Sequence, residues 1–195
     1  ASNNTAVGFQ ALNANTTGTN NVAVGKDSLD SNTTGNNNVA VGMDALQANI
    51  SGNNNVAVGT QALINNISAS NTAVGNDALA ANTTGTNNTA VGAGALDANI
   101  GGHDDTAVGT GVLGANTTGY SNVGVGGGAS YAAAALAANT TGYGHSALGA
   151  GALAQNTTGA LNTAVGRQAM YSSTTGSNCV AVGALALDAN TTGQS

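Results

Sequence analysis

Charge is what this 195-residue sequence lacks most. Charged residues make up 5% of the chain, whereas an ordinary soluble domain has about 25%. Lys26 and Arg167 are the strong bases, and eight Asp bring the net charge to −6, with no Glu. Clustered Lys and Arg are what bind nucleic-acid phosphates and anionic membrane surfaces, so both are excluded as partners.

Other absences exclude an intrachain disulfide and a membrane-spanning helix. There is no Pro, no Trp and a single cysteine, Cys179, which cannot form an intrachain disulfide. There is also no apolar run of the roughly 18 residues that a membrane-spanning helix needs, so we expect no membrane insertion by this segment. The first residues already belong to a repeat, so we expect a mature chain or a fragment.

What the sequence does have is one short repeat. Its consensus is N-(T/V)-A-V-G-x-x-A-L-x-A-N-T-T-G-x-N, and the Gly after the Val marks eleven copies. The spacing is 17 residues, except for 16 between Gly59 and Gly75 and 23 between Gly126 and Gly149. Self-similarity at a fixed period indicates an array. We therefore expect residues 1–195 to form a single repeat array, with an insertion at about 127–134.

Each copy has two segments and a turn. Segments such as 21–25, "NVAVG", are short, β-branched and closed by Gly, which is typical of a strand ending in a tight turn. "ALxAN" is too short for a stable helix, so we interpret it as a second extended segment. Asn-Thr-Thr-Gly is a turn, in which Gly18 and Gly35 are expected to supply the positive φ. The prediction is an all-β fold, a parallel β-solenoid or β-roll of eleven coils, about 50 Å long at the usual strand spacing.

Equal positions of stacked coils form ladders of identical side chains. We expect a Val ladder and a Leu ladder to point inward and form the core, and Asn ladders to line the turns. The inward ladders begin with Val7, Val24, Val41 and Val58, and with Leu12, Leu29, Leu46 and Leu63.

The Ala between the two outer strand residues is present in ten of eleven copies, with Gly124 in the other. With Val directed inward, this Ala would face outward, where a solvated surface would tolerate Lys or Thr. Its restriction to small residues indicates close packing against something else. A 17-residue coil also has a thin core, so we expect several chains to pack together, most simply as a homotrimer.

"NTAVG", "NVAVG" and the recurring "NTTGxN" resemble the head repeats of trimeric autotransporter adhesins and related repeats of phage tail fibres. The resemblance covers essentially the whole chain, although the repeat here is longer than the usual family repeat. It implies a left-handed parallel β-roll, with three chains around one axis. It also implies a location outside the cell, at the cell surface or on a virion fibre.

Few residues suggest chemistry. His103, Asp104 and Asp105 form the one His and Asp cluster and are the candidates for a cation site. The alternative, which we favour, is a solvated turn in which Asp replaces Asn, so no metal or other cofactor is expected. His145 and Cys179 occupy Asn-ladder positions and are interpreted as structural. In the insertion, Tyr131 is either a partner contact or part of a tolerated loop.

Asn-Thr-Thr and Asn-Ile-Ser match the glycosylation pattern in nine copies. We interpret them as turn chemistry instead, because Asn and Thr are favoured in turns.

The function expected is a structural and adhesive fibre segment, such as an adhesin head or a fibre shaft. Its expected partners are further copies of the chain, in a homotrimer or filament, and glycans, matrix or a host surface. Two alternatives remain: an ice-binding solenoid that uses the Thr pairs as an array, and a phage tail-fibre shaft. No Ser, His and Asp occur in an ordered catalytic arrangement, so an enzyme is not expected.

Overall fold

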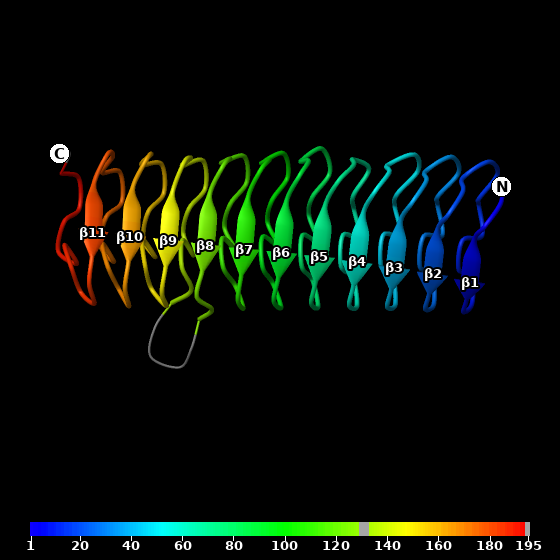
Figure 1. Ribbon diagram of the computed structural model, residues 1–195, viewed down its shortest axis with the longest axis horizontal. Helices are drawn as coiled ribbons and strands as arrows, with labels where there is room; N and C mark the ends of the chain where they lie inside the picture. Colours follow the sequence, from blue (N-terminus) through cyan, green and yellow to red (C-terminus); the bar gives the residue numbers. More distant parts are fainter. Residues whose placement is uncertain (129–132, 194–195) are drawn as a thin grey trace.

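A computed structural model describes residues 1–128 and 133–193 as a parallel β-solenoid (Figure 1). One three-residue strand comes from each repeat, and the strands pair in chain order into a single parallel sheet. No helix occurs within these described residues. The predicted all-β solenoid is thereby confirmed. The strands are β1 (Thr5–Val7), β2 (Val22–Val24), β3 (Val39–Val41), β4 (Val56–Val58), β5 (Thr72–Val74), β6 (Thr89–Val91), β7 (Thr106–Val108), β8 (Val123–Val125), β9 (Ser146–Leu148), β10 (Thr163–Val165) and β11 (Val180–Val182).

The strands stack in register, so that equal repeat positions face each other. Ala40 pairs with Ala57, and Val41 pairs with Val58. The register survives the 16-residue repeat, where Val56 pairs with Thr72, and the longest one, where Val123 pairs with Ser146. Changes in repeat length are therefore absorbed in the turns, and the ladders run through them without a shift.

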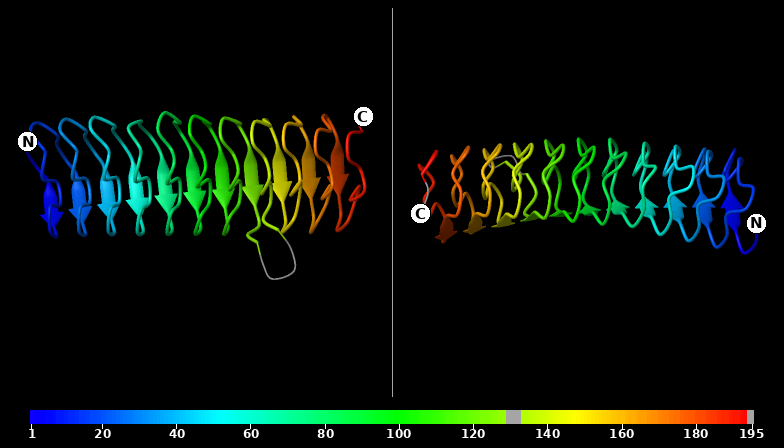
Figure 2. Two further views of the ribbon diagram at one scale, coloured as in Figure 1. Left: turned by 180° about the vertical axis from the view of Figure 1, so that it is seen from behind. Right: turned by 90° about the horizontal axis from the view of Figure 1, so that it is seen from above.

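Each coil is flat, with the sheet on one face and the turn segments on the other (Figure 2). The core between the two layers consists mainly of small Ala and one large residue per coil. Ala57 in the middle of β4 and Leu63 in the turn segment are both 0% exposed. The Leu ladder lies inside from Leu29 to Leu153, as predicted, and Met170 takes its place in the tenth coil; in the end coils Leu12 is partly buried and Leu187 is 51% exposed.

The Val ladder, in contrast, lies on the outside, which corrects the sequence prediction. In a three-residue strand the first and third side chains share one face and the middle one takes the other. The structure places the middle Ala inside and directs both outer residues to the surface. Val41 and Val58 are each 37% exposed, Val7 is 58% exposed, and Val24 is only partly buried. The two layers of a coil lie so close together that the Leu of the turn segment has room for an Ala at the middle of the strand. A Val at that position would not fit.

The restriction of the middle strand residue to Ala or Gly is therefore explained within one chain. Gly124 replaces the middle Ala of β8, and Val112 replaces an Ala of the turn segment before it. A Cβ on Gly124 would lie 2.7 Å from Cγ1 of Val112. One position has become smaller where its neighbour has become larger. The argument that a second chain must pack against this Ala is consequently wrong.

We predict that the two substitutions compensate each other. Gly124→Ala alone should destabilise the chain by about 1–3 kcal/mol through overpacking. Val112→Ala alone should cost about 1–2 kcal/mol by leaving a cavity. The double variant restores the Ala–Ala pair of the other coils and should unfold close to the parent. Urea unfolding of all four proteins measures the coupling, and strictly additive effects would contradict it.

The "ALxAN" segment is a turn, which corrects the extended conformation predicted for it. Its Leu lies in the left-handed region, with φ of 50° at Leu29 and 53° at Leu63. This conformation costs a bulky residue about 1–2 kcal/mol, whereas burying a Leu side chain contributes about 1.5–3 kcal/mol. Burial of the side chain thus outweighs the backbone strain.

Gly35 and its equivalents also differ from expectation, because their φ is not positive. These positions are Gly because there is no space for a side chain. A Cβ on Gly35 would collide with Asn32 Oδ1 of its own turn and with the carbonyl oxygen of Gly52 in the next coil. The close approach of neighbouring turns, and not turn conformation, requires Gly here.

Candidate functional site

Two columns of buried Asn side chains run along the turn edge of the solenoid. The strand-side column contains the residue just before each strand, and the turn-side column contains the first residue of each Asn-Thr-Thr-Gly turn. In the turn-side column, Asn49 Nδ2 donates to Asn32 Oδ1 at 2.9 Å and to the Gly52 carbonyl at 3.1 Å. In the strand-side column, Asn38 Oδ1 accepts from Asn55 N at 3.0 Å. The predicted Asn ladders are confirmed.

The glycosylation pattern falls on the turn-side column. Asn32, Asn49 and Asn82 are 0% exposed, and Nδ2, the atom that would carry a glycan, is hydrogen-bonded to the neighbouring coil. The structure thus leaves no room for a sugar on these side chains, which agrees with their interpretation as turn residues.

The Thr pairs do not form a free hydroxyl array. The first Thr of a pair donates its hydroxyl to the backbone of the next coil, as Thr33 Oγ1 does to the Ile50 carbonyl at 3.1 Å and Thr83 Oγ1 to the Ile100 carbonyl at 3.2 Å. These hydroxyls stabilise the stacking of the coils. The first hydroxyl of each of these pairs is therefore engaged with the backbone and not free for the exposed array that the ice-binding alternative would use.

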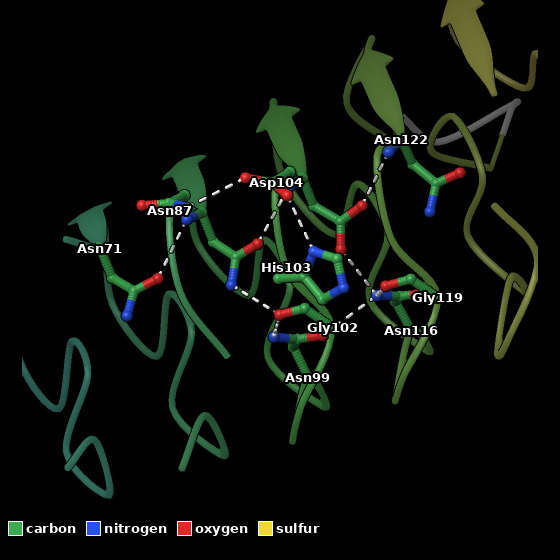
Figure 3. Close-up of polar contacts among 11 residues, drawn as sticks. Asn71, Asn87, Asn99, Gly102, His103, Asp104, Asn116, Gly119 and Asn122 are labelled. Atoms are coloured by element: carbon green, nitrogen blue, oxygen red, sulfur yellow. Dashed lines mark hydrogen bonds and ion pairs between the residues drawn. The ribbon is translucent and has the colours of Figure 1, made fainter. Parts of the chain in front are cut away.

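His103 and Asp104 form an exposed pair on the turn before β7 (Figure 3). His103 Nδ1 lies 2.8 Å from Asp104 Oδ2, and Asn87 Nδ2 donates to Asp104 Oδ1 at 3.1 Å. These hydrogen bonds, from His103 first and Asn87 second, lower the pKa of Asp104. For these two residues the interpretation as a solvated turn agrees with the structure.

Asp105 differs from its neighbours because it is 0% exposed. It occupies a strand-side position, where other coils have Asn. Its Oδ1 accepts from Asn122 N at 2.8 Å, and its Oδ2 lies 3.1 Å from Asn116 Nδ2. Burial raises the pKa of Asp105 to about 7, against the opposing effect of the hydrogen bonds from Asn122. The solvated turn predicted for Asp105 is therefore wrong.

The three candidate cation ligands do not act together. His103 and Asp104 are exposed, whereas the Asp105 carboxyl is enclosed in the strand-side column. Across the described parts of the chain, no three His, Cys or Asp side chains are grouped so that they could hold a metal ion. The arrangement is that of a hydrogen-bonded column with a buried acid at this coil.

His145 and Cys179 also replace Asn in the strand-side column, as their spacing indicated. His145 Nε2 lies 2.8 Å from the Gly159 carbonyl, and its Nδ1 accepts from Asn162 N at 3.3 Å. Desolvation lowers the pKa of His145 to about 4, so the ring is neutral at physiological pH. The neutral ring with a proton on Nε2 donates and accepts as an Asn amide does. Cys179 is buried, with Sγ 3.2 Å from the Gly193 carbonyl.

A stack of three aromatic rings lies beside this edge, and the sequence analysis missed it. The ring centroids of His103 and Tyr120 are 5.1 Å apart, and those of Tyr120 and Tyr143 are 4.9 Å apart. The signal was available, because each of the three directly follows the Gly that ends its turn, in three consecutive copies. The rings cover each other's faces, so they stabilise the coil stack and expose mainly their edges. Tyr131, the other predicted contact, lies outside the described residues.

Comparison with known proteins gives no assignment. No family model matches the chain, and no curated protein matches it either. Among the described residues there is no helix with the length and hydropathy needed to cross a membrane. Functional inference therefore depends on the surfaces of the solenoid itself.

Proposed function

We propose that the chain is a segment of a structural and adhesive fibre, in which copies associate side by side through the outer face of the sheet. The observation that carries the proposal is the exposed Val column. It supports self-association, and the resemblance to adhesin heads and tail fibres supports a location outside the cell, at a cell surface or on a virion.

The outer face of the sheet is uncharged along the whole solenoid, and the column of third strand residues on it is apolar. Val58, Val74, Val91 and Val108 are each 37–38% exposed and lie side by side. The first residue of each strand is Val, Thr or Ser, and none of the eleven strands contains a charged residue. A contiguous exposed apolar surface is typical of an interaction site.

A second copy of the chain suits this face better than a partner of different shape. Both surfaces would be uncharged, so no like-charge repulsion opposes their contact. Both would also present the same side chains at the same spacing, so parallel copies match coil for coil. The resemblance to trimeric adhesin heads supports three chains around one axis.

Adhesion would then use the surfaces that remain free, the polar turns and the outer turn segments. These surfaces repeat at every coil and carry little charge, which suits many weak hydrogen bonds to glycans or matrix. Linking such weak contacts can raise binding by about 10²–10⁴-fold. No catalytic step is part of this proposal.

The test combines native mass with surface binding. The triple variant Val41→Lys, Val58→Lys, Val74→Lys places charge on the outer face and leaves the core intact. A matched control, Thr34→Lys, Ser51→Lys, Thr84→Lys, adds the same charge on exposed turn residues. We expect the parent and the control to have three times the chain mass of 18.4 kDa and the Val variant to be a folded monomer.

Binding to immobilised glycans or matrix should fall at least 10²-fold in the monomeric variant. A parent chain that is monomeric at working concentration would refute the self-association. A trimeric parent that binds none of these surfaces would refute the adhesive role and leave the association intact.

A further inference from the structure

Asp105 stands where the solenoid otherwise uses an amide that both accepts and donates. Elsewhere in the strand-side column, Nδ2 of the Asn donates to the carbonyl of the turn Gly that follows. Asn38 donates to Gly52 O and Asn88 to Gly102 O, both at 2.8 Å. Gly119 is the corresponding turn Gly for Asp105. An ionised carboxylate has no proton to offer the Gly119 carbonyl.

The accepting half of the Asn pattern is preserved. Asp105 Oδ1 accepts from Asn122 N at 2.8 Å, as Asn88 Oδ1 accepts from Asp105 N at 3.0 Å one coil earlier. Asp105 is thus joined to the coils before and after it. Where an Asn amide has Nδ2, which donates, an ionised Asp105 has Oδ2, which can only accept.

The surroundings do not neutralise a negative charge at this point. Asp105 is fully buried; the coils on either side of it contribute the neutral amides of Asn88 and Asn122, and its own coil contributes that of Asn116. The charged or titratable groups that act on it are His103 and Asp104, both exposed and on its own turn.

We propose that Asp105 is a proton-dependent link in the strand-side column. With a proton on Oδ2, the carboxyl donates to the Gly119 carbonyl and completes the column as Asn does elsewhere. Without the proton, Asp105 Oδ2 and the Gly119 carbonyl are two acceptors that share a single donor, Asn116 Nδ2, at 3.1 and 3.0 Å in a buried site, and the coils around β7 and β8 open locally. Because each coil of a solenoid contacts only its neighbours, the effect stays near this link.

The direction of the pH dependence follows from the two states of the carboxyl. In the unfolded chain Asp has a pKa of about 3.9, whereas burial raises the pKa of Asp105 to about 7 in the folded chain. The folded chain therefore binds the proton more tightly. The stability from this link is complete below about pH 4, falls as the pH rises and is lost by about pH 7, with up to about a tenfold change in the opening equilibrium per pH unit.

Amide hydrogen exchange on the full chain at pH 5 and pH 8, corrected for intrinsic exchange rates, tests the proposal. In the parent, the amides of Asn122 and Val123 should lose at least about tenfold in protection between the two pH values. The amides of β2 to β4 should not. Asp105→Asn should abolish the local loss, and the control Asp104→Asn, at the exposed neighbour, should retain it.

Two further measurements keep the test decisive. The double variant Asn88→Asp, Asp105→Asn moves the carboxyl one coil back and should transfer the pH-dependent loss of protection to β6 and β7. Infrared spectra should show a protonated carboxyl that titrates near pH 7 in the parent and in Asp104→Asn, and that is missing in Asp105→Asn. Equal protection of the parent and Asp105→Asn at both pH values, or carboxyl titration confined to the region near pH 4, would overturn the proposal.

Discussion

Gly59→Ala is expected to open the sheet between β4 and β5. Gly59 follows β4 with φ of +138°, and a Cβ there would lie 2.6 Å from the carbonyl carbon of Gly75 in the next coil. The added methyl group collides with backbone, which cannot rotate away as a side chain could. Unfavourable φ and overpacking together should destabilise the chain by about 3 kcal/mol or more.

Gly94→Ala is the matched control for this variant. Gly94 also has positive φ, +62°, but the atom nearest to a Cβ there would be Asp97 Oδ2, at 3.9 Å. It should cost only about 1 kcal/mol. Thermal unfolding compares the two, and hydrogen exchange at Gly75 N, which donates to Val58 O, localises the damage. Equal losses in both variants would show that φ, and not the approach of the coils, limits this position.

Asn38→Ala is expected to have the second large effect, about 2–4 kcal/mol. The side chain is 0% exposed and satisfies two backbone groups, Asn55 N through Oδ1 and the Gly52 carbonyl through Nδ2. Removing it leaves Asn55 N buried without its acceptor and deprives Gly52 O of one of its donors. Each buried group left unpaired costs about 1–3 kcal/mol.

The control for Asn38→Ala is Thr34→Ala, an exposed residue of the turn that precedes it. Its effect should stay within about 0.5 kcal/mol. Urea unfolding measures both, and hydrogen exchange at Asn55 N should show the loss in the Asn variant alone. If Asn38→Ala unfolds like the control, the Asn columns contribute alignment without stability.

The periodicity of the sequence was sufficient to predict the stacking of the coils. Identical strands 17 residues apart pair in register because any shift would misalign the Leu column and both Asn columns together. Leu29, Leu46 and Leu63 were placed correctly inside for the same reason. The predicted turns after them were also found, although their conformations were not anticipated.

The direction of the strand side chains could not be predicted from the alternation alone. In "VAV" one face carries two Val and the other a single Ala, and hydrophobicity favours burying the Val. The thickness of the coil instead directs the Ala inward and the two Val outward, because Leu63 already fills the space beneath Ala57. The sequence did indicate which face is inward, because a larger residue at Val112 occurs together with a smaller one at Gly124. This is seen only when the two positions are considered as a pair.

At the candidate site, the difference between Asp104 and Asp105 was hidden by their adjacency. Both looked like members of one polar turn. Counting in steps of 17 residues places Asp105 in the same column as Asn88 and Asn122, which are buried, and Asp104 in the same column as the exposed Asn87. The position of a residue within the repeat, more than its type, therefore distinguishes the buried Asp105 from the exposed Asp104.

The stacking of coils also determines how the rod responds to force. The hydrogen bonds between coils run along its length, and every coil is held only by the coils beside it. A pull along the axis therefore loads the outermost junction first, and coils detach one after another from an end. Each 17-residue coil releases about 50 Å of extended chain as it detaches. Such a rod lengthens stepwise under load and absorbs mechanical work, while the coils that remain stacked keep their shape.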